Sequence, residues 1–200
     1  MTRVAFDLVH GDFILRPASG MSVDINRSDR DLLDLSTFFV WSQRLGLFPN
    51  EARGWNELEQ ASMVVLPLPG RKLCEEDAKR LLAWVRGGGR LLVLAEGQHE
   101  SSRAALLLNP AGLAAIPAIA YAGYGTPVLT IQGGEALWKD DHGRVVAARA
   151  RLGKGTIVAC GVGRTFGAAV MGGAFTEPDA DRERVYEFEY ALLRACLDLK

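Results

Sequence analysis

Four ionisable residues directly follow two apolar segments of the chain. His10 and Asp12 come after the first of these segments, and Glu96 and His99 come after a later one. If both segments are parallel strands, these side chains gather at the carboxyl edge of a sheet, where α/β proteins bind ligands. Glu96 with His99 or His10 then has the residue types that activate water on an amide or glycosidic bond. Alternatively, Glu96 binds ligand hydroxyl groups or caps the helix that follows it.

The predicted crevice also takes residues from the loop after the last apolar strand. Arg164 and Thr165 lie there, where an anion or hydroxyl group could meet a helix N-terminus, and a solvated loop is the alternative. The spacing of His10 and Asp12 is not diagnostic of a metal site, and no complete nucleotide-binding motif is present, so we expect neither metal nor cofactor. The predicted ligand-binding residues are His10, Gly11, Asp12, Glu96, Gly97, Gln98, Arg164 and Thr165.

The three cysteines offer no clear nucleophile. Cys160 lies inside an apolar strand and Cys196 on the apolar face of the last helix, and buried thiols are inert. Cys74 takes the N-cap position of a predicted helix, where a reactive thiol and a tolerated surface residue are both open readings. Three dispersed cysteines make neither a disulfide framework nor a zinc site. They favour a reducing, cytoplasmic location.

The stretch from residue 63 to residue 98 contains the elements that must position this crevice. Residues 63–66 form a short apolar run ended by prolines, which is typical of a strand buried on both faces. Apolar residues at helical spacing follow, and three consecutive glycines end that helix. Residues 91–95 form a second buried strand. Strand, helix and strand at this length predict a right-handed parallel βαβ unit.

The flanking segments predict further strands and helices. A capping signal at Ser28 predicts the start of an amphipathic helix. Residues 47–53 could hold an edge strand, although Pro49 argues against it. Residues 111–125 are apolar without a clear period, which leaves a packed loop or a short helix with a turn as the expectation. Residues 144–160 predict an antiparallel hairpin, and a helix closes the chain.

Size and charge limit the class of protein. The chain has 200 residues, of which 48% are hydrophobic, and a formal net charge of -1. This is enough for one domain spanning residues 1–200 with a substantial core. A charge near zero without a basic run gives no reason to expect nucleic acid. No apolar stretch is long enough to cross a bilayer, so we expect no membrane insertion.

Four parts of the chain together resemble a known superfamily. They are residues 63–97, the opening strand with its His10-Gly11 end, the segment 150–160, and the closing helix. The pattern is similar to the class I glutamine amidotransferase-like superfamily in its non-catalytic branch, which includes the intraflagellar-transport and gliding-type GIFT domains and related bacterial domains of unknown function. The resemblance implies a three-layer flavodoxin-like α/β sandwich. Its sheet would be mostly parallel, with an antiparallel β-hairpin near the C-terminal edge.

The same resemblance argues against amidotransferase chemistry. Catalytic members carry a cysteine on a strained elbow after the strand that follows the glycine-rich helix end, and the matching residue here is Glu96. Their downstream His-Glu pair is also absent after Cys160. The resemblance therefore implies a non-catalytic ligand-binding or assembly domain that binds a saccharide or a protein.

Three hypotheses about function and partners stay open at this point. The first is the non-catalytic domain, with a small polar ligand or an unknown protein as its partner. The alternative is a hydrolase that uses Glu96 with a nearby histidine. The third is a structural subunit in which an apolar patch around residues 111–124 pairs with another protein or forms a homodimer.

Overall fold

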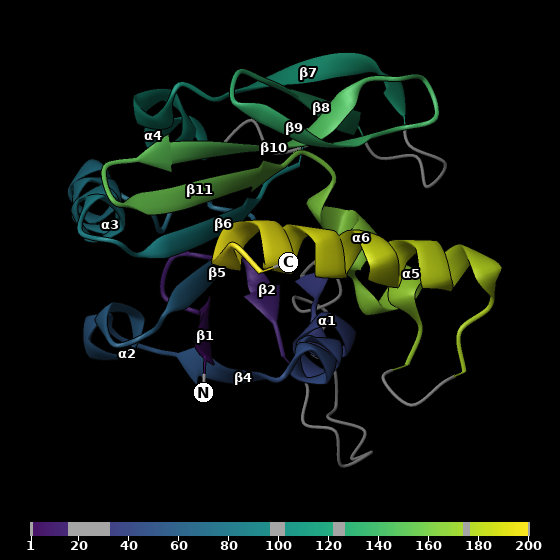
Figure 1. Ribbon diagram of the computed structural model, residues 1–200, viewed down its shortest axis with the longest axis horizontal. Coiled ribbons are helices and arrows are strands. Elements are labelled where there is room, and N and C mark those ends of the chain that lie inside the picture. Colours follow the sequence, from purple (N-terminus) through teal and green to yellow (C-terminus); the bar gives the residue numbers. More distant parts are fainter. Residues whose placement is uncertain (1, 16–32, 97–102, 122–126, 174–176, 200) are drawn as a thin grey trace.

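The computed structural model describes residues 2–15, 33–96, 103–121, 127–173 and 177–199. Its centre is a seven-stranded sheet in the order β4-β1-β5-β6-β11-β10-β9 (Figure 1). The four pairings from β4 to β11 are parallel, and the β11–β10 and β10–β9 pairings are antiparallel. These strands are β1 (Thr2–Asp7), β4 (Leu47–Ala52), β5 (Met63–Pro67), β6 (Arg90–Leu94), β9 (Glu135–Lys139), β10 (Val145–Leu152) and β11 (Gly155–Cys160).

Helices cover both faces of this sheet, which makes the domain a three-layer α/β sandwich of the flavodoxin-like kind (Figure 1). One face packs against α1 (Ser36–Ser42), α5 (Ala168–Met171) and α6 (Ala180–Leu197), and the other against α2 (Trp55–Glu59), α3 (Glu75–Arg86) and α4 (Ala105–Leu108). We call these the α6 face and the α3 face. The predicted fold class, including the antiparallel hairpin of β10 and β11, is confirmed.

Side-chain alternation divides the core between the two faces. Along β6 and the residue after it, Leu92 and Leu94 join the cluster under α6, whereas Leu91, Val93 and Ala95 join the cluster under α3. All five are buried, because a central parallel strand has helices on both sides. Burial on both sides explains why these strands appear in the sequence as continuous apolar runs. The alternation also determines toward which face of the sheet the residue after such a run points its side chain.

The βαβ unit of β5, α3 and β6 forms as predicted. Helix α3 begins with Cys74 as N-cap, whose sulfur accepts a hydrogen bond from the backbone N–H of Asp77. Its acidic first turn complements the positive end of the helix dipole. At the other end, the left-handed conformation falls on Gly88, with a φ of 124°, and not on the cap residue Gly87. Gly88 is the residue directly after the C-cap, the usual position of a left-handed glycine at the end of a helix.

Two segments differ from the sequence predictions. Residues 114–121, expected as a loop or short helix, form β7 (Ala114–Tyr121), which pairs with β8 (Pro127–Gln132). Small residues hid the strand, because their spacing gives no amphipathic period. The helix predicted from Ser28 begins only at Ser36, after β3 (Leu33–Asp34), which pairs with β2 (Phe13–Ile14). Ser28 itself lies outside the described residues.

The edge strand that Pro49 argued against is present as β4. It pairs in parallel with β1 on one side and has no strand on its other side within the described part of the chain. An edge position tolerates a residue without an N–H, because one side of such a strand needs no hydrogen-bond donor. Short 3₁₀ turns complete the fold: η2 (Gln43–Leu45), η3 (Asn109–Ala111) and η4 (Gly163–Phe166). Within the described ranges, no helix has the length and apolarity needed to cross a membrane.

Helix α6 carries one carboxyl group into the core. Glu189 is fully buried, and neither of its carboxyl oxygens has a hydrogen-bond partner among the described residues. Burial raises the pKa of Glu189 well above its ordinary value, because a charged carboxylate is poorly solvated there. The folded protein therefore binds this proton more tightly than the unfolded chain does.

This proton makes the stability of the domain depend on pH. Above a pH of about 4.5 the unfolded chain ionises Glu189 while the folded protein keeps it neutral, so stability falls as pH rises toward the folded pKa. We expect Glu189→Gln to gain up to about 1.4 kcal/mol over the native protein per pH unit in this range. Urea unfolding between pH 4 and pH 8 measures this gain. Glu187→Gln, at an exposed position of the same helix, is the control, and a pH-independent gap for Glu189→Gln would contradict the prediction.

Candidate functional site

Glu96 lies directly after β6 at the carboxyl edge of the sheet. Its side chain is on the α6 face, in register with Leu94, and it forms an ion pair with Arg164 of η4. Backbone hydrogen bonds hold the two loops together: the Ala95 N–H donates to the Cys160 carbonyl at 2.7 Å, and the Gly163 N–H donates to the Ala95 carbonyl at 2.9 Å. The structure thus brings two of the predicted site residues together, in a buried pair.

The strained elbow expected at Glu96 is absent there. Among the described residues, the non-glycine residues with positive φ are Leu68, at 45°, and Asp198, at the end of α6. Leu68 follows the central strand β5, lies between two prolines, and donates its N–H to the Leu94 carbonyl at 2.7 Å. The left-handed residue therefore belongs to the neighbouring strand and holds an apolar side chain buried in the core.

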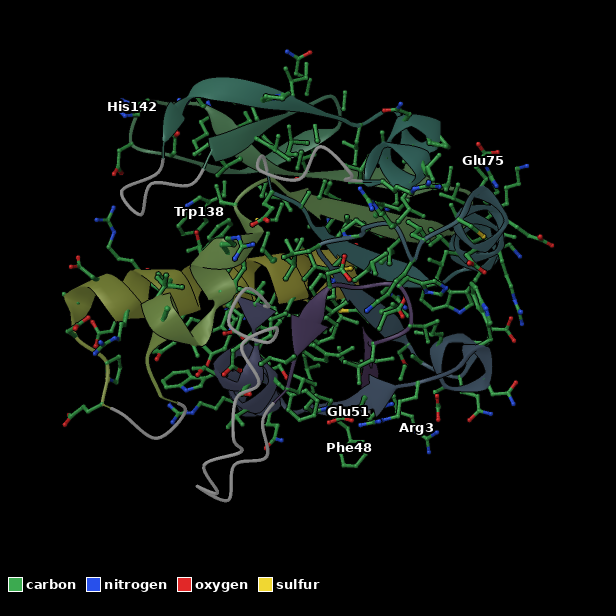
Figure 2. The ribbon with its side chains drawn as sticks, turned by 180° about the vertical axis from the view of Figure 1, so that it is seen from behind. Arg3, Phe48, Glu51, Glu75, Trp138 and His142 are labelled. Carbon is green, nitrogen blue, oxygen red and sulfur yellow. The ribbon has the colours of Figure 1, made fainter. Side chains whose placement is uncertain are left out.

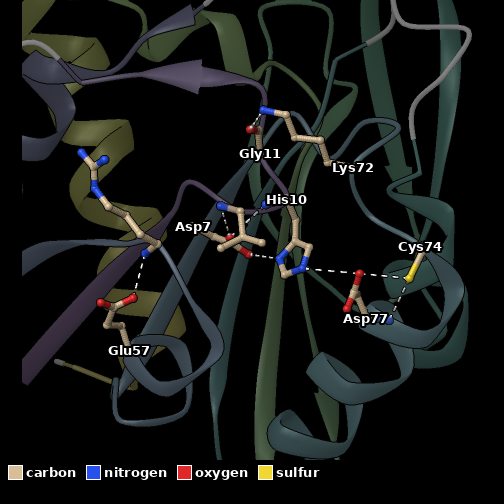
Figure 3. Close-up of polar contacts among 9 residues, drawn as sticks. Asp7, His10, Gly11, Glu57, Lys72, Cys74 and Asp77 are labelled. Atoms are coloured by element: carbon tan, nitrogen blue, oxygen red, sulfur yellow. Dashed lines mark hydrogen bonds and ion pairs between the residues drawn. The ribbon is translucent and has the colours of Figure 1, made fainter.

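His10 lies on the other face of the sheet. Its Nδ1 is 2.7 Å from Oδ2 of Asp7, and its Nε2 is 3.6 Å from Oδ2 of Asp77 on α3 (Figure 3). The ring of Trp55 packs against it with centroids 5.1 Å apart. Asp7 is fully buried, and its Oδ1 accepts the backbone N–H groups of Val9 and His10. This arrangement ties the loop after β1 to the start of α3.

Cys74 extends this chain of contacts at the surface. Its thiol donates to Oδ2 of Asp77 at 2.9 Å, so the carboxylate lies between the thiol and His10 (Figure 3). The other two cysteines are buried, as predicted. Burial raises the pKa of Cys160 to about 12 and also raises that of Cys196, so neither is a nucleophile near neutral pH.

The loop after His10 approaches the backbone of β5 closely. A Cβ on Gly11 would lie 2.6 Å from the Pro67 carbonyl oxygen, so only glycine fits there. Asp12 donates its backbone N–H to the same carbonyl at 3.3 Å, and its carboxylate pairs with Lys72 at 3.3 Å. Both residues have local structural partners. Gly97, Gln98 and His99 lie outside the described residues.

The predicted crevice therefore divides into two groups. His10 contacts α2 and α3 on one face, whereas Glu96 contacts η4 on the other, and β5 lies between their two strands. Within the described ranges no contact joins the two groups. A water-activating pair of Glu96 and His10 needs both side chains on one substrate position, and this geometry separates them.

A groove on the α6 face, next to η4, contains polar residues that the sequence did not single out. It has a volume of about 350 Å³, near the lower end of the range for small-molecule sites. It lies between α6 and the turn of the β9–β10 hairpin; Trp138 is inside this angle and His142 at the outer end of the turn (Figure 2). Of the predicted site residues that the structure describes, Thr165 alone lines it.

The groove has an apolar floor and a charged rim. Trp138 stacks on Phe188 of α6 with ring centroids 4.7 Å apart, and Val128, Val146, Val162 and Val185 complete the floor. The rim is the hairpin turn with Asp140, Asp141 and Arg144, joined by Arg184 from α6. The sequence pattern gave no sign that α6 would pack beside this turn.

Hydrogen bonds keep the rim ordered and charged. Arg144 binds Oδ2 of Asp140 through Nε at 2.7 Å and Nη2 at 2.6 Å. Partial burial alone would raise the pKa of Asp140, but the hydrogen bonds from the Arg144 side chain and from the backbone N–H groups of Arg144 and His142 outweigh it and lower that pKa below its ordinary value. The carboxylate thus stays ionised at the groove. No group of three His, Cys, Asp or Glu side chains among the described residues could hold a metal ion.

Comparisons with known proteins show similarity in fold. No protein-family profile matches the sequence, and no curated protein matches it. Among solved structures, the N-terminal domain of mmIFT52 has a TM-score of 0.51 at 12% identity, with 94% of this chain and 97% of that chain covered. A cytoplasmic protein of Salmonella typhimurium LT2 has a TM-score of 0.50 at 11% identity, with 99% and 98% covered. These likenesses establish the fold.

Two larger enzymes contain the same architecture. The exo-β-1,4-mannosidase Op5Man5 from Opitutaceae bacterium strain TAV5 has a TM-score of 0.50 at 17% identity, and the GH42 β-galactosidase Gan42B has a TM-score of 0.51 at 16%. The matches cover 98% and 100% of this chain but 36% and 30% of the enzymes. The chain therefore spans about a third of the length of these glycosidases.

The left-handed conformation of Leu68 predicts that a glycine at this position gives a more stable protein than an alanine. We expect Leu68→Gly to be about 1 kcal/mol more stable than Leu68→Ala, because glycine alone adopts positive φ without a Cβ clash. Leu66, in the preceding strand β5 with ordinary φ, is the control, where glycine is the less stable of the two by about 0.5–1 kcal/mol. Urea unfolding measures both pairs. The same order at both positions would contradict the strain at residue 68.

The buried tie between Asp7 and His10 predicts a large cost for its removal. Asp7→Asn places an amide against His10 Nδ1 and removes a charged acceptor, so we expect a loss of about 2–3 kcal/mol in unfolding free energy. Asp12→Asn, at the half-exposed pair with Lys72, should cost less than about 0.5 kcal/mol. Chemical denaturation measures both. Equal losses of unfolding free energy in the two variants would contradict the prediction that burial makes the Asp7 contact the more stabilising one.

Proposed function

We propose that this chain is a non-catalytic binding domain of the glutamine amidotransferase-like superfamily, allied to the GIFT domains. The observation that carries this proposal is the state of the residue after β6. There a buried Glu96 is ion-paired to Arg164, in place of a thiol that could attack a substrate. The likeness of fold to the mmIFT52 domain over nearly the whole of both chains supports the same assignment.

We place the ligand in the groove between α6 and the β9–β10 hairpin. The aromatic and valine floor suits the C–H face of a sugar ring, and the planar carboxylate and guanidinium groups of the rim suit its hydroxyl groups. Such an amphipathic site favours a saccharide over a fully apolar molecule. Two enzymes that contain this fold within longer chains, a mannosidase and a β-galactosidase, act on saccharides, which supports this ligand class.

Other features bear on the alternatives. The hydrolase alternative needs a histidine beside Glu96. His10 lies on the opposite face of the sheet, which argues against that pair, and the pair of Glu96 with His99 stays open because His99 lies outside the described residues. Three free cysteines and a Salmonella cytoplasmic protein of the same fold support a cytoplasmic location. Binding of a partner protein and formation of a homodimer stay hypotheses, since the groove provides no evidence for or against either.

Saccharide binding to the groove gives a direct test. We expect the domain to bind members of a panel of β-linked mannose, galactose and uronic acid oligosaccharides in isothermal titration calorimetry. Trp138→Leu keeps an apolar side chain but removes the indole ring from the floor, and should weaken binding about tenfold, or ~1.4 kcal/mol.

The matched control is Trp84→Leu, on α3 at the other face of the sheet, which should leave the affinity unchanged. Circular dichroism verifies that both variants are folded. If the native protein binds no saccharide at millimolar concentration, or if Trp84→Leu weakens binding as much as Trp138→Leu, the proposed ligand site is wrong.

A further inference from the structure

One ion pair joins the two walls of the groove. Asp141 lies in the turn between β9 and β10, Arg184 lies on α6, and Oδ1 of Asp141 is 3.6 Å from Nη2 of Arg184. Both side chains are largely exposed, at 91% and 72%. An exposed and loose pair of this kind contributes little to stability, so a ligand that offers better hydrogen bonds displaces it at small cost.

The neighbouring carboxylate, Asp140, has no acceptor position left for a ligand. Its Oδ1 accepts the backbone N–H groups of His142 at 3.0 Å and Arg144 at 2.9 Å, and its Oδ2 contacts Nε and Nη2 of the Arg144 side chain. A carboxylate offers about four acceptor positions, and these four contacts use them all. Asp140 therefore fixes the turn, which presents the next residue, Asp141, on an ordered backbone.

Among the described residues, the formal charges that face the groove cancel. Each of the two aspartates in the turn is paired with one arginine. Lys139 follows Trp138 in β9 and is opposite Val145, which packs on the cluster under α3, so strand alternation directs its side chain away from the groove. This balance of charge suits a neutral ligand better than an ion.

We infer that Asp141 and Arg184 together bind two adjacent hydroxyl groups, a vicinal diol, of a neutral sugar. One hydroxyl donates to the Asp141 carboxylate and its neighbour accepts from the Arg184 guanidinium, while the C–H face of the ring packs on Trp138. A diol suits such a pair because each hydroxyl is both a donor and an acceptor. The inference rests on the proposed function, because it names the ligand chemistry and the selecting residues of the same groove.

The first test removes the hydroxyl groups of the ligand one at a time. β-Linked mannobiose and galactobiose, and analogues of each that lack a single hydroxyl group, are titrated into the native protein in isothermal titration calorimetry. We expect loss of either hydroxyl of one vicinal pair to weaken binding about three- to tenfold, because hydrogen bonds to charged groups that stay partly in water have modest strength. The other analogues should bind as the parent disaccharide does.

The second test removes the two side chains. Asp141→Ala and Arg184→Ala should each weaken binding of the parent disaccharide about three- to tenfold, and each should abolish the discrimination against one of the two critical analogues. The matched controls are Glu75→Ala on α3, at the other face of the sheet, and Arg194→Ala near the end of α6, both at exposed positions. The controls should keep the native affinity and discrimination. Circular dichroism verifies that all four variants are folded.

The dependence on salt tests the neutral character of the ligand. We expect the affinity for the parent disaccharide to change less than about twofold between low and high ionic strength, because screening acts on charged ligands. A large fall in affinity with salt would contradict a neutral ligand.

The possible failures are distinct. If a disaccharide binds but no adjacent pair of its hydroxyl groups matters, or if the control variants weaken binding as much as Asp141→Ala and Arg184→Ala, the diol site is wrong while saccharide binding stands. If neither disaccharide binds at millimolar concentration, and the wider panel of oligosaccharides also fails, the proposed function itself is overturned.

Discussion

The domain depends on one set of interactions, the parallel pairing of β5, β6 and β11 with both faces buried. Each of these strands puts alternate apolar side chains under α3 and under α6, so the hydrogen-bonded ladder and both halves of the core form together. The ladder continues past the strand ends through the Leu68, Ala95 and Gly163 N–H groups. This continuation positions every loop at the carboxyl edge to which we assign chemistry.

The same alternation explains why the polar residues at this edge separate. Asp7 follows Ala5 in register and faces α3, whereas Glu96 follows Leu94 and faces α6. A shift of one residue would reverse the face. His10 therefore joins a buried tie to Asp7 and Asp77, and Glu96 joins Arg164. Each pair satisfies charges that would be costly to bury alone, and each is a structural element of its own face.

The groove arises where the sheet changes direction. After β11 the pairing becomes antiparallel, and the β9–β10 hairpin extends beyond the end of the parallel strands toward the N-terminal half of α6. The stacked rings of Trp138 and Phe188 join the two elements. The hairpin turn is thereby held in place, and its charged residues surround an apolar floor. A rigid scaffold that presents a polar turn beside exposed aromatic surface is a common basis for ligand sites.

The sequence alone determined the fold class, the βαβ unit, the hairpin and the inert state of Cys160 and Cys196. These follow from the spacing of apolar residues and from caps, which are local properties of the chain. The strand at residues 114–121 could not be recognised in this way, because its small residues have no period, and the start of α1 depends on strand β3 before it. Pro49 argued against strand β4 for a similar reason. A proline is tolerated in an edge strand, and only the order of strands in the sheet shows that β4 is at the edge.

For the candidate site, the sequence correctly predicted which loops lie at the carboxyl edge of the sheet, but not toward which face of the sheet their side chains point. It predicted that Glu96 and Arg164 belong together, and the structure places them in an ion pair. It could not separate His10 from Glu96, because the face of each side chain is set by strand register and sheet order. It also could not reveal the groove, since Trp138 and Phe188 are 50 positions apart and meet only when α6 packs across the sheet. Local chemistry fixed which elements form, and long-range packing decided which side chains share a site.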